Sequence, residues 1–448
     1  MLNRYIVPEL HTTVYSFDGT DSVSTTTVCP DRYNALFAIL DNKSHISIQG
    51  GSLSLPLATA ASNSVTVQSL SFNRILSFCP NQNLITVEGG IRIGDLLAFL
   101  VKNNKWISPL PGYPSITVGG CIGFNVHGKG KGYFSETIDC LTFYHPRYGE
   151  LTASAEKNED LFNLTLGGMG ATGFITSVTL KTTALKGVTF KKRRIPVDNL
   201  IHAVQLMSDL RSSHDQVYSW HNLVSFSDDS FGKGYIYLED FSRIKEKKSR
   251  RKYRAITSQN RGSHPAKLAK PLMGKHINYV YNFFEKCKST EEILNVENGA
   301  FPISGKEVYY HLFGKRGYRE YQASIPQKNW EYFVSELKKL CQNNKPDITL
   351  GSLKIFNRTF DNYINFCHQG VILAINAVSN RKTLSFFNEM DRLVVKYQGL
   401  PNIYKDSRIS REIIRTCYKD NYHNFVKDLS DFDESHIFTN SHLQRILE

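Results

Sequence analysis

The sequence lacks three features that would place it in special classes of protein. Its 8 cysteines are scattered, with no Cys-x-x-Cys pair, so we expect neither a metal site nor a disulfide framework. The longest apolar run, Gly370–Val378, is about half the length of a membrane span. The first ten residues lack the apolar core of a secretion signal. These absences predict a soluble protein of a reducing, cytoplasmic compartment.

The composition is that of an ordinary globular protein. Of 448 residues, 41% are hydrophobic and 21% are charged. Because a chain of this length is too long for one core, we expect two domains.

The formal net charge of +13 is concentrated in one segment. Between Arg243 and Lys288 there are 14 Lys/Arg residues against Glu246 and Glu285, which gives 14 − 2 = +12. Three interpretations stay open: a solvated loop, a contact with an anionic membrane surface, or contact with nucleic acid through its phosphates. The sequence gives no reason to expect specific nucleic-acid recognition.

One glycine-rich stretch, residues 109–132, organises the chain. Its glycines lack the Cβ that would hold a backbone away from a ligand. We expect Thr117–Gly120 to form an extended piece that enters a tight bend, so that backbone N–H groups face a phosphate or a flat, acceptor-rich ring. The plainer alternative is a glycine-rich turn between strands. The seven glycines are Gly112, Gly119, Gly120, Gly123, Gly128, Gly130 and Gly132.

Two further glycine clusters flank this stretch. Gly50-Gly51-Ser52 follows a short predicted strand at residues 46–48, and Gly167–Gly173 precedes a predicted strand at residues 175–181. Either cluster alone is weak evidence for a phosphate cradle. Three clusters in succession favour a site for a phosphate or a flat, acceptor-rich ring over a plain glycine-rich turn.

Hydrophobic periodicity predicts an α+β fold. Alternating helices and strands fill a first domain, residues 1–185. A second domain, residues 186–400, contains aromatic-rich alternating strands of an antiparallel sheet and carries the basic insert 243–288. A mostly helical segment, residues 401–448, closes the chain. The predicted strands of the second domain are 216–224, 234–239, 308–313, 321–326, 348–356 and 371–377, and its predicted helices are 330–340 and 383–397.

The order and content of these clusters resemble the vanillyl-alcohol oxidase superfamily, the flavoproteins with an FAD-binding fold of the p-cresol methylhydroxylase type. Within it, the chain resembles most the decaprenylphosphoryl-β-D-ribose 2′-oxidase family, and the resemblance covers essentially the whole chain. The matching runs are Leu110–Gly112, Ile116–Ile122, Val126–Lys129, Leu161-Phe162, Gly167–Gly173, Tyr321-Gln322, Ile325-Pro326, Leu353–Phe356, Tyr404–Arg408, Ile437-Phe438 and Arg445–Leu447.

The resemblance implies that residues 1–185 bind FAD and that residues 401–448 return to it. The first loop would hold the pyrophosphate, the central loop the flavin and the third loop the adenine side. The cofactor-binding residues that it implies are Gly50, Gly51, Ser52, Leu53, Ser54, Leu55, Gly112, Thr117, Val118, Gly119, Gly120, Cys121, Gly123, Asn125, His127, Gly128, Gly170, Gly173, Ile175 and Lys405.

The resemblance also implies catalytic residues. Lys405 would lie beside the pyrimidine edge of the flavin, where a fixed cation stabilises the reduced, anionic ring. The residues that would face a sugar and its phosphate are His127, Lys129, Tyr321, Gln322 and Lys354. Each has a structural alternative: a surface ion pair for Lys405, a core histidine for His127, the wet face of a strand for Lys354 and core packing for Tyr321.

Some positions depart from the family pattern. Residues 49–55 contain no histidine or cysteine, so we expect FAD to be bound non-covalently. Leu55 stands where the sugar oxidases have a tyrosine. Ala374 and Ile372 stand where they have a cysteine and an asparagine. These departures leave the predicted cofactor unchanged and leave the substrate open.

The resemblance implies the oxidation of a secondary hydroxyl of a sugar, first of all a polyprenyl-phosphate-linked pentose. The oxidation would be the first half of an epimerisation that a separate nicotinamide-dependent short-chain reductase completes. A lipid-linked substrate would give the basic insert 243–288 a role in peripheral contact with the inner face of the membrane. The alternatives are an aldonolactone or other free-sugar oxidase, and a membrane- or nucleic-acid-binding protein that has kept the flavin fold without activity.

Overall fold

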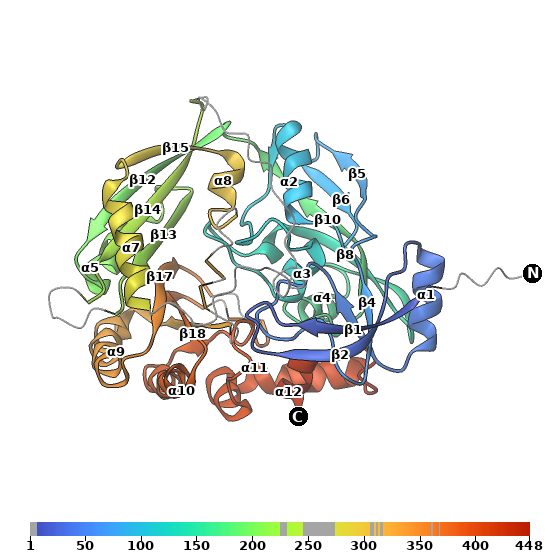
Figure 1. Ribbon diagram of the computed structural model, residues 1–448. Coiled ribbons are helices and arrows are strands. Elements are labelled where there is room, and N and C mark those ends of the chain that lie inside the picture. Colours follow the sequence, from blue (N-terminus) through green and yellow to red (C-terminus); the bar gives the residue numbers. More distant parts are fainter. Residues whose placement is uncertain are drawn as a thin grey trace, which may run out of the picture.

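The computed structural model shows two lobes, joined along one side by the C-terminal helices (Figure 1). It describes residues 7–224, 231–244, 274–304, 309–310, 312–313, 317–359, 362–366 and 368–448. The predicted α+β fold with an antiparallel second sheet is confirmed by the strand pairing.

The N-terminal lobe contains a small sheet in the order β1-β2-β4-β3. Strand β4 pairs in parallel with both neighbours, whereas β1 and β2 form an antiparallel hairpin. Helix α1 (Tyr33–Asn42) buries Leu36 and Leu40 in the same core as Val28, Ile46 and Val67. The strands are β1 (Glu9–Tyr15), β2 (Ser22–Val28), β3 (Ile46–Gln49) and β4 (Val65–Gln68).

A five-stranded antiparallel sheet completes this lobe, in the order β5-β6-β10-β8-β9. Helix α2 (Ile93–Lys102) has apolar residues at helical spacing and buries them beside this sheet. The strands are β5 (Ile75–Cys79), β6 (Leu84–Val87), β8 (Ile138–His145), β9 (Gly149–Ala153) and β10 (Phe174–Lys181). The short strands β7 (Lys105–Trp106) and β11 (Thr183–Ala184) pair with each other, and helix α4 spans Glu159–Thr165.

The second lobe is built on an eight-stranded antiparallel sheet, in the order β15-β12-β14-β13-β17-β18-β16-β19. Its strands are β12 (Thr189–Val197), β13 (Gln216–His221), β14 (Gly234–Ser242), β15 (Glu291–Asn295), β16 (Tyr318–Ile325), β17 (Ile348–Phe356), β18 (Gly370–Val378) and β19 (Leu400–Pro401). The helices of this lobe are α5 (Leu200–Leu210), α7 (Gly274–Cys287), α8 (Val296–Ala300), α9 (Trp330–Asn344) and α10 (Arg381–Lys396).

The two faces of this sheet carry different side chains. Helices α5, α9 and α10 cover one face and form the largest apolar core, with residues such as Leu238, Leu353 and Leu373. Because successive residues of a strand point to opposite faces, their neighbours face the other lobe. Gln322 of β16 and Lys354 of β17 therefore line the space between the lobes.

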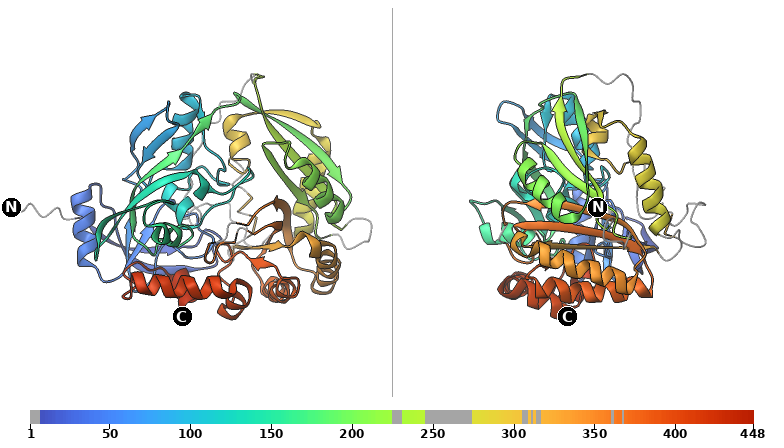
Figure 2. Two further views of the ribbon diagram at one scale, coloured as in Figure 1. Left: turned by 180° about the vertical axis from the view of Figure 1, so that it is seen from behind. Right: turned by 90° about the vertical axis from the view of Figure 1, so that its left-hand side faces the viewer.

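The C-terminal segment contacts the N-terminal lobe. Helices α11 (Arg411–Phe432) and α12 (Ser441–Leu447) run beneath it (Figure 2). Between them, the carbonyl of Ile437 accepts a hydrogen bond from the Ile46 amide at 2.7 Å, and Thr439 accepts one from the Ser47 hydroxyl at 2.7 Å. Asn440 donates to the Met169 carbonyl at 3.1 Å.

Three local predictions need correction or lie partly outside the described residues. Residues 117–120 do not form an extended piece, because Val118–Gly123 form the short helix α3. Of the predicted strand 308–313, Tyr309 and Tyr310 lie in a single helical turn, residues 312–313 lie in a turn, and residues 308 and 311 are outside the described residues. The basic insert also lies mostly outside them, but its last part forms helix α7. No helix within the described ranges has both the length and the hydropathy of a membrane span.

Candidate active site

A cavity of about 320 Å³ lies where the glycine loops of the first lobe meet the sheet of the second lobe. Segments from Phe17 to Lys405 contribute to its walls. Predicted residues that line it are Gly50, Gly51, Ser52, Leu53, Ser54, Leu55, Gly112, Thr117, Gly119, Gly120, Gly123, Asn125, His127, Gly170, Gly173, Ile175, Gln322, Lys354 and Lys405.

Most of the loop glycines allow the loops to pack on one another. A Cβ on Gly51 would lie 2.3 Å from the Ser115 carbonyl oxygen, and one on Gly119 would lie 3.1 Å from the oxygen of Gly89. A Cβ on Gly112, in contrast, would meet nothing within 4 Å among the described atoms. The sequence predicts that these glycines allow a ligand to approach the backbone closely. In the structure, close approach of backbone to backbone explains Gly51 and Gly119 directly.

Helix α3 explains why two predicted cofactor residues lie outside the cavity lining. The Thr117 hydroxyl caps the helix by accepting a hydrogen bond from the Gly120 amide at 3.1 Å. In the helical conformation Val118 and Cys121 are buried in the core of the first lobe. Gly128 also lies outside the lining, because its Cα packs against the Leu110 backbone, whose oxygen would lie 2.2 Å from a Cβ.

The loop side of the cavity offers polar groups that lack a protein partner. The amides of residues 50–55 donate to no backbone carbonyl within the described ranges. Asn125, 2% exposed and with a φ of 36°, has no hydrogen-bond partner for either side-chain amide atom in the described part of the chain. The same holds for the Ser54 hydroxyl. Buried polar groups need partners, so this side is suited to a ligand rich in acceptors and donors.

The sheet side of the cavity is a chain of hydrogen bonds that ends at Lys405. Asn402 donates to the Gln322 side chain at 2.9 Å, and Gln322 donates to Glu320 at 2.6 Å. The Lys405 ammonium lies 3.8 Å from the Glu320 carboxylate. Tyr404 donates to the Gly167 carbonyl at 2.9 Å and so connects this segment to the third glycine loop.

His127 lies at the boundary of the two sides. Its ring packs against Phe356 and Phe366, with centroids 5.2 and 5.6 Å away. Burial lowers the pKa of His127 well below its ordinary value, and the charges of Lys354 and Lys405 lower it further. The imidazole is therefore neutral at neutral pH. Its Nδ1 has no hydrogen-bond partner among the residues that the structure describes.

Lys129 lies outside the cavity lining, in a buried cluster of the second lobe. Its ammonium lies 3.5 Å from the Glu239 carboxylate and 4.4 Å from the centroid of the Tyr218 ring. It also donates to the Gly299 carbonyl at 3.3 Å. Burial is the main cause that lowers the pKa of Lys129 to about 7, and Glu239 opposes the shift. Lys129 thus joins the glycine-loop lobe to the sheet.

Tyr321 also lies outside the cavity lining, because strand alternation places it on the opposite face from Gln322. It is fully buried in the core under α10. Its hydroxyl donates to Asp391 at 3.0 Å, and Asp391 accepts two hydrogen bonds from the Arg408 guanidinium, at 2.6 and 3.0 Å. Arg408 also donates to Asp406 at 3.0 Å. This network fixes the backbone segment that carries Lys405.

Sequence reasoning missed the aromatic and amide part of the lining. Phe17 and Tyr310 meet edge to face, with centroids 5.2 Å apart. Among the motif runs, only the neighbour of Lys405, Tyr404, carried a signal that could have been used. The other missed lining residues include Tyr113, Phe124, Tyr318, Glu320, Asn365, Phe366 and Asn402.

Comparisons with known proteins agree with this geometry. A family model described as "FAD binding domain" matches residues 30–146. The chain carries an FAD binding domain. FAD is its cofactor, and the predicted resemblance to the vanillyl-alcohol oxidase superfamily is confirmed at the level of fold and cofactor.

Individual relatives are oxidoreductases. The chain is 24% identical over 362 residues to decaprenylphosphoryl-beta-D-ribose oxidase of Mycolicibacterium smegmatis, covering 78% of this chain and 77% of the relative. It is 26% identical over 185 residues to L-galactono-1,4-lactone dehydrogenase of Arabidopsis thaliana, which covers 40% of this chain and 30% of that enzyme. Cholesterol oxidase from Brevibacterium sterolicum, studied as a point mutant, shares the fold with a TM-score of 0.66, at 11% identity over 99% of this chain and 98% of that one.

The residues that line the cavity fit FAD. The amides of residues 50–55 and the Ser54 hydroxyl are suited to phosphate oxygens, because N–H and O–H donors are what a pyrophosphate accepts from. The two amide atoms of Asn125 can pair with the acceptors and donors at the edge of a flavin ring. Lys405 supplies the nearby positive charge. The chain is therefore an FAD-dependent oxidoreductase, related in sequence to oxidases of sugar derivatives.

Proposed function

We propose that the protein oxidises a secondary hydroxyl of a sugar carried on a polyprenyl phosphate, first of all a pentose. The observation that supports this most is the sheet side of the cavity, where Lys354, Lys405 and Gln322 stand beside His127. Two cations and an amide suit a substrate that combines a hydroxylated ring with a phosphodiester. The Mycolicibacterium relative is named as an oxidase of the same substrate class.

Each residue has a role in this proposal. When bound, FAD would supply the hydride acceptor for the carbon that carries the hydroxyl. As that C–H bond breaks, the hydroxyl proton leaves through a hydrogen bond to the neutral His127 imidazole and on to water. Lys405 places a positive charge beside the flavin site, which would stabilise the reduced, anionic form of the ring. Lys354 binds the phosphate, and the Glu320–Gln322–Asn402 chain holds Lys405 in position.

The product of this reaction is a keto sugar, which retains its lipid carrier. We propose that a separate nicotinamide-dependent short-chain reductase consumes it. Reduction from the opposite face of the ring would invert the carbon and complete an epimerisation.

The experiment is anaerobic mixing of the FAD-loaded chain with three probes. The probes are a short-chain polyprenylphosphoryl ribose, free ribose and an aldono-1,4-lactone, and the measurement is the loss of the visible absorbance of oxidised FAD. We expect bleaching by the phosphodiester and none by free ribose. Bleaching by the lactone but not by the phosphodiester would overturn the proposal in favour of an aldonolactone substrate, the substrate class of the plant lactone dehydrogenase.

A variant pair tests the phosphate role of Lys354. Lys354→Met should raise the phosphodiester concentration for half-maximal bleaching about tenfold, because a charge-assisted hydrogen bond contributes about 1.5–3 kcal/mol. The control is Lys382→Met, which removes an exposed lysine of α10. Equal behaviour of the two variants would contradict the proposed phosphate contact.

A further inference from the structure

Helix α7 contacts the sheet through a side that carries polar groups and one packed aromatic ring. Asn278 is buried and donates to the Ile348 carbonyl at 3.0 Å. About two helical turns further along, Glu285 accepts a hydrogen bond from Tyr237 at 2.9 Å and pairs with Arg194 at 3.4 Å. Polar contacts of this kind attach α7 to the face of the sheet that also borders the cavity.

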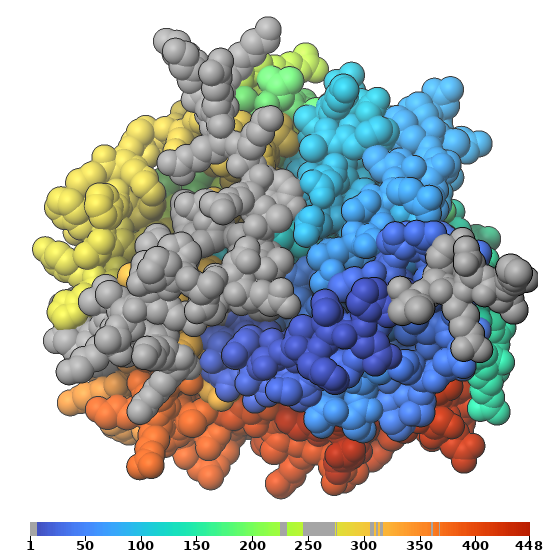
Figure 3. All heavy atoms as spheres, turned by 45° about the vertical axis from the view of Figure 1, so that its right-hand side comes forward, coloured from blue at the N-terminus to red at the C-terminus, as the bar shows by residue number. Residues whose placement is uncertain are grey.

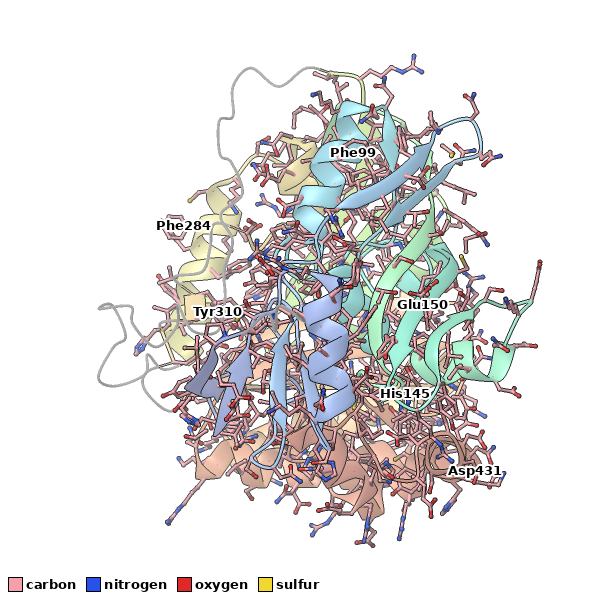
Figure 4. The ribbon with its side chains drawn as sticks, turned by 90° about the vertical axis from the view of Figure 1, so that its right-hand side faces the viewer. Phe99, His145, Glu150, Phe284, Tyr310 and Asp431 are labelled. Atoms are coloured by element: carbon pink, nitrogen blue, oxygen red, sulfur yellow. The ribbon has the colours of Figure 1, made fainter. Side chains whose placement is uncertain are left out.

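The opposite side of α7 is apolar and faces solvent. Tyr279 is 73% exposed, Val280 50%, Phe283 55% and Phe284 58%. Their spacing of i, i+1, i+4 and i+5 places them on one side of the helix. Figure 4 shows Phe284 on the side of α7 that points away from the rest of the molecule, and Figure 3 shows α7, in yellow, as part of the surface.

This arrangement is the reverse of an ordinary surface helix, which buries its apolar side. The apolar side of α7 therefore contributes little to holding the helix on the sheet. A contiguous exposed apolar patch of this kind marks an interaction surface.

We propose that the outer side of α7 (Tyr279, Val280, Phe283 and Phe284) docks the protein onto a membrane that contains anionic lipid. The helix closes a stretch with 14 cations and two acidic residues, from Arg243 to Lys288. Aromatic side chains insert at the boundary between headgroups and acyl chains, and cations are attracted to anionic headgroups. The docking serves the proposed function, because a lipid-linked sugar is reached from the membrane surface.

The same observations disfavour the other occupants of this surface. Two copies of the chain would bring two segments of +12 charge together, which costs repulsion. Nucleic acid would be held by the cations alone and gives no reason for four exposed apolar side chains on one helix.

The test is co-sedimentation of the full FAD-loaded chain with vesicles of phosphatidylcholine alone or mixed with phosphatidylglycerol. We expect sedimentation with the mixed vesicles and little with phosphatidylcholine. The double variant F283Q/F284Q keeps good helix formers and should lower the partition coefficient at least about tenfold, from the loss of two buried rings. The matched control is Tyr332→Gln, which removes a 69% exposed aromatic from helix α9.

The outcomes separate this proposal from its alternatives. Equal sedimentation of F283Q/F284Q and the wild type would overturn it, as would a wild type that dimerises or binds a DNA duplex but does not bind vesicles. Far-ultraviolet circular dichroism and FAD content show whether each variant is folded. Vesicle binding requires no turnover, so a chain that docks but oxidises no lipid-linked sugar would overturn the proposed substrate and leave the docking surface intact.

Discussion

The two sides of the cavity bind by different means. The loop side presents backbone amides and glycines from three segments of the first lobe, and its described lining residues include no charged side chain. The sheet side presents Lys354, Lys405, Glu320 and Gln322, held by strand pairing and hydrogen bonds. The shape of the loop side depends on glycines, which lack a side chain. The charges of the sheet side depend on strand alternation, which decides the face to which each side chain points. Substitutions should therefore disturb the two sides differently.

The largest loss of stability is expected from the buried ion pairs that hold the Lys405 segment of the sheet side. Arg408→Met leaves Asp391 and Asp406 without their cation, so we expect a loss of about 3–5 kcal/mol in the free energy of unfolding. Chemical denaturation of the FAD-free chain measures it. The segment that carries Lys405 should loosen as well, which a shift in the visible FAD spectrum reports.

Tyr321→Phe sharpens this result. It removes one hydrogen bond to Asp391 and should cost about 1 kcal/mol of stability. Because Tyr321 faces the helical core, the rate of FAD reduction by a substrate should hardly change. A rate loss much larger than the stability loss would return Tyr321 to the catalytic residues that the sequence predicted.

On the loop side, Gly51→Val should weaken FAD binding about 100-fold, because overpacking costs about 1–3 kcal/mol and Val must displace the Ser115 backbone. FAD titration followed by fluorescence measures the affinity. In Gly112→Ala the added Cβ meets no described protein atom, so the melting temperature of the FAD-free chain should stay unchanged. A fall in that temperature equal to the one in Gly51→Val would show that the two glycines have the same role.

Lys405→Met should leave FAD bound and change its chemistry. Loss of a cation beside the flavin disfavours the reduced, anionic form, and we expect the two-electron potential to fall by about 30 mV, which is about 1.4 kcal/mol. Spectroelectrochemistry measures the potential. The control is Lys396→Met, which removes a lysine from an exposed ion pair with Glu336. A potential unchanged by Lys405→Met would remove Lys405 from the flavin site.

A further effect concerns pH and the buried Lys129. Its pKa is about 7 in the folded chain, against 10.5 ordinarily, so between these values the unfolded chain binds more protons. Stability from this group therefore rises as the pH increases from about 7 to about 10, by about 1.4 kcal/mol per pH unit at most, and the cost of the buried charge is fully present below pH 7. Lys129→Met should remove this slope in denaturation curves. An unchanged slope would show that Lys129 is not the titrating group.

The sequence by itself determined the elements that depend on local pattern. Glycine clusters predicted the three loops, the family resemblance of those loops predicted FAD, and period-two alternation predicted strands β14, β16, β17 and β18 close to their observed bounds. Lys405 and His127 were predicted because each lies within a run that matches the family, Tyr404–Arg408 and Val126–Lys129. Local pattern is enough to predict the loops and these strands, because a glycine or an alternation of apolar residues constrains the backbone next to it whatever the rest of the fold is.

The tertiary structure alone decided which motif residues reach the cavity. Tyr321 and Gln322 are neighbours in sequence, yet the pleat of β16 sends one to the helical core and the other to the cavity. Lys129 lies outside the cavity lining because its ammonium pairs with Glu239, which is 110 positions away along the chain. Val118 and Cys121 turned inward because residues 118–123 close a helical turn instead of extending. Strand phase and long-range charge pairing arise only when distant segments pack, so no local pattern carries them.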